Sequence, residues 1–256
     1  MLFHRRGAAA RRLGDWIMKK FVFALLFLIM GTFTGLFGCL YFFASHDKGL
    51  TGEWTADLDM TEQAAVTALG WLQDIEAVSV SLKDMESYMQ GLTVQVNLTL
   101  EETARSEGTF CCNVLPESYE ACNQAAYEAF AAVFRELLTE RLRMSGYTGD
   151  TDKEAIEALV TETFGMSTVS YLMSCGPALL PSLEELQAQY DGSGTYEAAE
   201  GILLRQFDDG RSAAAKAECY VRRESDLILY EEDASDSSGL FSDHYPMIYT
   251  LNESKP

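Results

Sequence analysis

The residues from Phe21 to Phe43 form an unbroken run of 23 residues without a charged side chain. A helix over this run is about 34 Å long at ~1.5 Å per residue, which is enough to cross a bilayer core of ~30 Å with some tilt. The length of the run and its lack of charge predict a transmembrane helix. This helix divides the chain into a short segment before the membrane and a long segment after it.

The segment before the run is basic, with six lysine and arginine residues against one acid, Asp15. Positive charge favours the cytoplasmic side of a membrane. We therefore expect residues 1–20 to be a cytoplasmic tail, residues 21–43 a signal anchor and residues 44–50 a tether. Residues 51–256 would form an extracytoplasmic domain. The predicted location is the cell membrane, crossed once, with the lipid bilayer as the partner of the anchor.

Two other interpretations of the run stay open. A cleaved secretory peptide would need a shorter apolar region of ~7 to 15 residues and a small-residue cleavage site, which Ala44-Ser45-His46 matches poorly. Leu36-Phe37-Gly38-Cys39 is similar to a degenerate bacterial lipobox, in which Cys39 would carry a lipid. We favour the signal anchor, and all three interpretations leave the domain outside the cytoplasm.

The part of the chain after the run is strongly acidic. It has 13 lysine and arginine residues against 38 aspartate and glutamate residues, because six of the 19 bases and one of the 39 acids precede it, so its net charge is −25. Such a surface repels phosphate backbones, and the few bases form no stripe, so we predict no nucleic-acid partner. Solubility outside the cell explains the acidity.

Five cysteines follow the run, an odd number that leaves at least one thiol unpaired within the chain. The adjacent Cys111 and Cys112 would point to opposite faces of a strand and are not expected to bond to each other. No Cys-x-x-Cys pair is present, and the only histidines after the run are His46 and His244. We therefore predict no metal site and no cofactor, and expect most thiols to be small buried hydrophobes.

Several segments alternate between apolar and polar residues, as expected for strands with one buried face. The clearest are 52–58 and 92–101, and a partner strand containing Phe110 follows the second after a polar turn. Five more segments follow, around Tyr196 and over residues 202–207, 215–222, 226–230 and 245–251, and turn residues such as Asp191-Gly192 are expected to form tight hairpins between strands. About eight strands can close into an antiparallel barrel without an exposed edge, so the predicted fold class is α+β.

Apolar residues at helical spacing predict a helix over 61–72 and a helical insertion over 117–189 within the barrel. In the insertion, Pro116 opens a long helix that stops near Gly146. A second helix begins with the capping box Thr151-x-x-Glu154, and a last short one with Ser182-x-x-Glu185.

The opening Gly52-Glu53-Trp54 resembles the Gly-x-Trp motif of lipocalin-like barrels. The closing region, with Tyr245-Pro246-Met247-Ile248-Tyr249, is similar to that of membrane-anchored, lipocalin-like (calycin-type) proteins of unknown function from Gram-positive bacteria. In those chains, too, a helical block interrupts the β domain. The lipocalin motifs around Thr-Asp-Tyr and a late arginine have no match here. The resemblance implies a barrel, a tryptophan that plugs one end of it, and a surface location.

Two classes of function follow. In the first, the barrel holds a small apolar ligand at the cell surface, and Trp54, Val94, Val96 and Phe110 line or plug its cavity. In the second, side chains fill the barrel, no ligand is bound, and the domain is a surface module that binds a protein partner or has a structural role.

No motif points to an enzyme, and we predict no catalytic residues. Asp243 and His244 could form part of a catalytic triad, but the sequence has no Gly-x-Ser-x-Gly motif to supply the nucleophilic serine. No sequence motif supports a catalytic pair of Cys175 with His244 either. The acidic loop over 231–243 lacks the pattern of a calcium-binding hand, and the glycosylation pattern at Asn97 falls in the middle of a strand.

Overall fold

The computed structural model describes residues 49–73, 80–208, 216–231 and 245–252. Residues 50–256 belong to one compact unit. The predicted tail and anchor, and all but the end of the tether, lie outside the described residues. Among the helices that are described, none combines the length and the apolar character needed to span a membrane.

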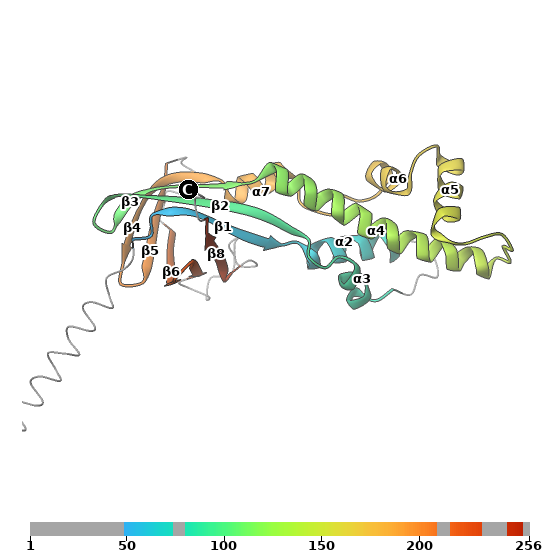
Figure 1. Ribbon diagram of the computed structural model, residues 1–256, viewed down its shortest axis with the longest axis horizontal. Helices are drawn as coiled ribbons and strands as arrows, with labels where there is room; N and C mark the ends of the chain where they lie inside the picture. Colours follow the sequence, from blue (N-terminus) through green and yellow to red (C-terminus); the bar gives the residue numbers. More distant parts are fainter. Residues whose placement is uncertain (1–48, 74–79, 209–215, 232–244, 253–256) are drawn as a thin grey trace, which may run out of the picture. The chain divides into compact units, whose positions relative to one another are not determined.

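Eight antiparallel strands form a closed barrel in which each strand pairs with the next along the chain and the last pairs with the first (Figure 1). This confirms the α+β class and the predicted barrel, and the barrel is compatible with a lipocalin-like fold. The strands are β1 (Gly52–Asp59), β2 (Thr93–Ala104), β3 (Glu107–Val114), β4 (Gly192–Ala199), β5 (Ile202–Phe207), β6 (Lys216–Arg223), β7 (Asp226–Glu231) and β8 (Met247–Leu251).

Alternation along β2 explains why the chain closes in this register. Val94, Val96, Leu98 and Leu100 are buried, while the residues between them are half-buried on the outer face. A shift of one residue would turn this whole apolar set to water, so the pattern fixes the register.

The two ends of the barrel differ. At one end, three two-residue turns join β2 to β3, β4 to β5 and β6 to β7. The middle turn is Glu200-Gly201, where both residues have positive φ, as a type I′ hairpin requires. Since antiparallel strands alternate in direction, all the long connections leave from the opposite end, which we call the helical end.

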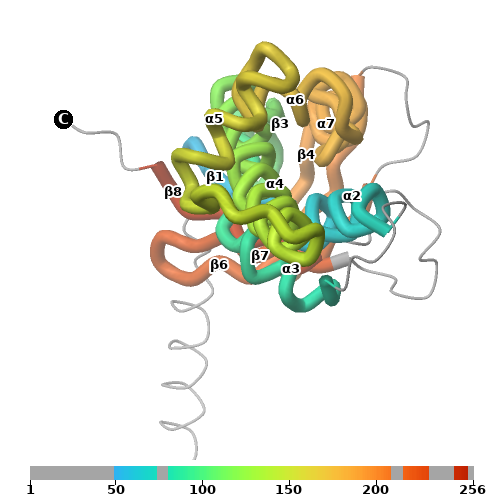
Figure 2. The backbone as a smooth tube through the Cα atoms, turned by 90° about the vertical axis from the view of Figure 1, so that its right-hand side faces the viewer, coloured from blue at the N-terminus to red at the C-terminus, as the bar shows by residue number. Residues whose placement is uncertain are grey.

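The helices are α2 (Thr61–Gln73), α3 (Leu82–Tyr88), α4 (Pro116–Met144), α5 (Lys153–Phe164), α6 (Thr168–Cys175) and α7 (Leu183–Tyr190). The first two lie between β1 and β2, and the other four form the predicted insertion between β3 and β4. Seen from the helical side, α4 runs through the middle of the helices and contacts α3, α5 and α6 (Figure 2). Trp71 packs edge-on against Phe130 at 5.6 Å between ring centres, which joins the helices into the same core as the barrel.

Three local predictions need comment. The capping box at Ser182 and Glu185 is confirmed. The one at Thr151 is wrong, because Asp152 is the N-cap of α5 and accepts the N–H of Ala155 through its carboxylate. The expected hairpin turn at Asp191-Gly192 is also wrong, since Asp191 ends α7 and Gly192 already begins β4.

Candidate functional site

The four residues predicted to line a cavity all point into the barrel. The exposed fraction is 0% for Trp54, Val94 and Val96 and 3% for Phe110. A side chain beside an open, ligand-sized space would keep surface that a water molecule can touch. These four side chains are therefore packed against other side chains in this structure.

Trp54 is buried near the end of the barrel that carries the short turns. Its ring N–H donates to the backbone carbonyl of Leu50 at 2.9 Å. The guanidinium of Arg222, from β6, lies over the ring with its central carbon 5.3 Å from the ring centre. Arg222, which no sequence motif singled out, thus covers the Trp54 ring in a cation–π contact.

A group of polar side chains lies near the helical end of the barrel, formed by Arg205 on β5, Lys216 and Glu218 on β6, and Tyr245 just before β8. We call it the charged group. The Nε and one Nη of Arg205 donate to the two carboxylate oxygens of Glu218 at 2.7 and 2.8 Å. Lys216 Nζ lies 3.3 Å from Glu218 Oε1, and the hydroxyl of Tyr245 donates to the same oxygen.

Burial makes this group unusual. Glu218 is completely buried and the side chain of Arg205 is 6% exposed, whereas that of Lys216 is 25% exposed. The guanidinium of Arg205 also lies 5.4 Å from the ring centre of Phe110 and 5.6 Å from that of Phe207. Phe110, predicted to line or plug a cavity, therefore contacts the guanidinium of an arginine in this structure.

The protonation of the group follows from its packing. Burial raises the pKa of Glu218, but the nearby charges of Arg205 and Lys216 and the hydrogen bond from Tyr245 outweigh it, so the pKa is lowered overall. Glu218 therefore stays ionised at neutral pH. Burial raises the pKa of the neighbouring Cys112 thiol to about 11. A protonated thiol and an ion-paired carboxylate are poor nucleophiles. The charged group is therefore suited to holding β5, β6 and the segment just before β8 together inside the barrel.

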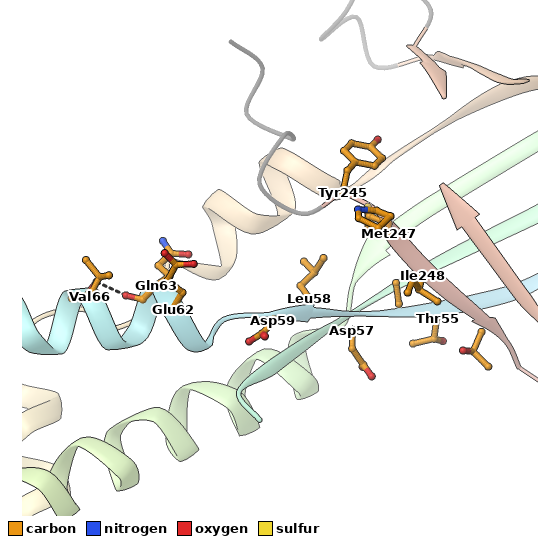
Figure 3. A pocket seen from close by; sticks show the side chains of 14 residues that line it. Thr55, Asp57, Leu58, Asp59, Glu62, Gln63, Val66, Tyr245, Met247 and Ile248 are labelled. Carbon is orange, nitrogen blue, oxygen red and sulfur yellow. Dashed lines mark hydrogen bonds between the residues drawn. The ribbon is translucent and has the colours of Figure 1, made fainter. Parts of the chain in front are cut away.

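A second feature is a split between β1 and β8. Their ladder contains only three pairs and stops at Ala56 with Tyr249, so the next pair in that register, Asp57 with Ile248, does not form. A groove of about 1040 Å³ opens there between β1, α2 and β8 (Figure 3). We call it the split groove. Its wall includes Thr55, Asp57, Leu58, Asp59, Glu62, Val66, Met247 and Ile248.

A third feature is an apolar outer face on β5 to β8, made of Ile202, Leu204, Val221, Ile228, Tyr230 and Ile248. Five of these side chains are between 36% and 54% exposed. Val221 pairs with Ile228, which pairs with Ile248, so the residues are neighbours across the strands. With strands ~4.8 Å apart and ~6.8 Å between alternate residues, the face spans roughly 14 Å in each direction between Cα atoms. Exposed apolar side chains that are contiguous in this way mark an interaction surface more often than apolar side chains scattered singly.

The other positions considered for chemistry give no second site. Asp243, His244 and residues 232–243 of the acidic loop lie outside the described residues. Cys175 is exposed, and the five described cysteines are all free thiols. The side chain of Asn97 accepts a hydrogen bond from Thr55. Among the described residues, no cluster of histidine, cysteine or acidic side chains has the arrangement of a metal site.

No protein-family model, no curated protein and no solved structure matches this chain. The likeness to lipocalin-like proteins therefore depends on the eight-stranded antiparallel barrel.

Proposed function

We propose that this chain is a membrane-anchored, extracytoplasmic, lipocalin-like domain that acts as a surface module for binding a protein partner. The observation that carries the proposal is the apolar outer face on β5 to β8, on a barrel whose predicted ligand-lining residues are packed inside. A barrel filled by side chains needs no ligand for its stability. An exposed apolar face on a soluble domain, in contrast, is costly unless a partner covers it.

The location is supported by the sequence. Residues 21–43 are uncharged and follow a basic segment, and the part after them has a net charge of −25. Protease added to intact cells should therefore remove the domain and leave a short protected fragment that contains the anchor. Full protection of the domain would contradict the proposed location.

Site-specific photo-crosslinking on intact cells tests the binding role. A photoreactive residue at Val221, which is 40% exposed on the apolar outer face, should form a discrete crosslinked protein product. The matched control is Thr109, which is exposed on the polar outer face of β3. The same product from both positions, or none from Val221, would contradict a binding role for this face.

A second function is favoured by the split groove. Its volume of about 1040 Å³ suits a small apolar ligand, and the buried Leu58 and Met247 form part of its wall. In this case a lipid or another apolar compound should copurify with the full chain and be seen by native mass spectrometry. Replacing Met247 with a polar residue should then remove it.

A further inference from the structure

We propose that the split groove binds an extended, basic segment of the protein partner. The inference rests on the proposed binding function and specifies the chemistry of the partner. It depends on three observations at the split: exposed carboxylates without a paired base, unpaired strand edges, and exposed apolar side chains beside them.

The rim of the groove is acidic. Asp57, Asp59 and Glu62 are exposed and line it, and its wall contains no lysine, arginine or histidine among the described residues. Asp57 accepts a hydrogen bond from the side chain of Gln95 at 3.0 Å, and Asp59 accepts the backbone N–H of Thr61 at 2.8 Å. Both bonds come from neutral donors. None of the three carboxylates forms an ion pair with a described base.

The strand edges at the split offer backbone hydrogen bonds. Asn252 donates its backbone N–H to the carbonyl of Glu53 at 2.8 Å, so Glu53 and every second residue after it direct their backbone groups toward β8. Asp57 belongs to this set but has no partner in the ladder. An extended peptide can satisfy such an edge by adding to it as a strand.

Apolar contacts complete the groove. Ile248 is 54% exposed and Val66 is 51% exposed, and both lie in its wall, as Figure 3 shows. Ile248 also belongs to the apolar outer face, so the groove and that face form one continuous surface. A peptide that alternates apolar residues with lysine or arginine would place the first kind on Ile248 and Val66 and the second on the acidic rim.

The charge of the groove favours a basic peptide over two other possible occupants, a second copy of this chain and an anionic membrane. A second copy of this chain would bring another net charge of −25 after its anchor, which repels an acidic rim. An anionic membrane would be repelled in the same way. A basic protein segment is attracted, and the attraction weakens as salt rises.

The test uses the purified full chain and two labelled synthetic peptides, one alternating valine with lysine and one alternating valine with glutamate. Fluorescence anisotropy should detect binding of the lysine peptide only. Asp57→Asn with Glu62→Gln should weaken that binding about tenfold. The matched control, Glu120→Gln with Glu162→Gln, removes the same charge from exposed helical positions and should change it less than about twofold.

Ile248→Thr tests the apolar part, because threonine keeps the branched shape that suits a strand. It should weaken binding of the lysine peptide about fivefold. Equal weakening by the rim and control variants would overturn the proposal, as would equal binding of both peptides. These results leave the crosslink at Val221 unaffected, so failure of the partner chemistry can be told from failure of the binding function.

One further result would also overturn it, namely a dimer of the full chain in sedimentation that Ile248→Thr dissociates. Circular dichroism and thermal melting of each variant show whether it is folded. If Ile248→Thr does not fold, Val66→Thr on the exposed side of α2 replaces it, with the same expected loss.

Discussion

Replacing Glu218 with glutamine should destabilise the barrel strongly. The substitution keeps the size of the side chain but leaves the buried guanidinium of Arg205 without its countercharge. In the native protein, the ionised carboxylate of Glu218 accepts two hydrogen bonds from Arg205 and one from Tyr245. Removing one partner of a buried ion pair costs about 3 to 5 kcal/mol. For a domain of this size, that loss lowers the melting temperature by roughly 6 to 20 °C.

Thermal and urea unfolding of the full chain, followed by circular dichroism, measure this loss. Glu197→Gln is the matched control, because Glu197 is exposed on β4, and its effect should stay within about 0.5 kcal/mol. The double variant Arg205→Met with Glu218→Leu should recover most of the stability, since it removes both charges and fills the space. A loss below about 1 kcal/mol for Glu218→Gln would refute the reasoning and mean that water reaches the pair.

The pH dependence of the unfolding free energy tests the same ion pair. Because the folded pKa of Glu218 lies below the ordinary value of 4.5, the pair stabilises the fold fully above that value. This stabilisation is lost as the pH falls through the folded pKa. The gap in unfolding free energy between the native chain and Glu218→Gln should therefore be constant from pH 7 to about 5 and shrink in stronger acid. A gap that widens in acid would contradict this.

Three other predictions concern the barrel and its loops. Trp54→Phe removes the ring N–H bond and weakens the guanidinium contact, so it should cost about 2 kcal/mol in urea unfolding. Iodoacetamide at pH 8 should modify the exposed Cys111 in the native protein, whereas Cys112, with its pKa of about 11, should react only after unfolding, as read by peptide mass spectrometry. Gly194→Ala places a Cβ 1.9 Å from a backbone oxygen and should cost roughly 1 to 3 kcal/mol in thermal melts, while Gly70→Ala, in open space on α2, should stabilise by about 0.5 to 1 kcal/mol.

The first three strands could be predicted because each has one apolar and one polar side. In 92–101, every second residue is apolar, and the structure buries that set. The Ser182 cap was also readable, since its partner Glu185 stands three positions later. Helix α3 was missed, because its capping box pairs Ser81 with an aspartate, Asp84, in place of the usual glutamate or glutamine.

The later strands were harder to interpret because apolar residues lie on both faces of β5, β7 and β8. In Ile202 to Phe207, neither side is clearly polar, so the sequence does not say that Arg205 points inward. The sequence did contain one indication of the direction of this side chain. Arg205 lies two residues from both Leu203 and Phe207, so alternation along the strand places all three side chains on the same face. Even so, it is the pairing register of β5 with β6 that brings Arg205 and Glu218 within bonding distance, and local spacing in the sequence does not give that register.

The unequal ends of the barrel have a consequence for how such a protein can change over generations. The tight hairpins leave no room for extra residues, whereas a connection at the opposite rim can grow or shrink at a cost of only about 0.6 kcal/mol for each doubling of its length. Residues inserted into these connections would change the surface of the molecule without altering the hydrogen-bonded pairing of the barrel strands. Descendants of this chain should therefore diverge in length at one rim and keep the other almost unchanged.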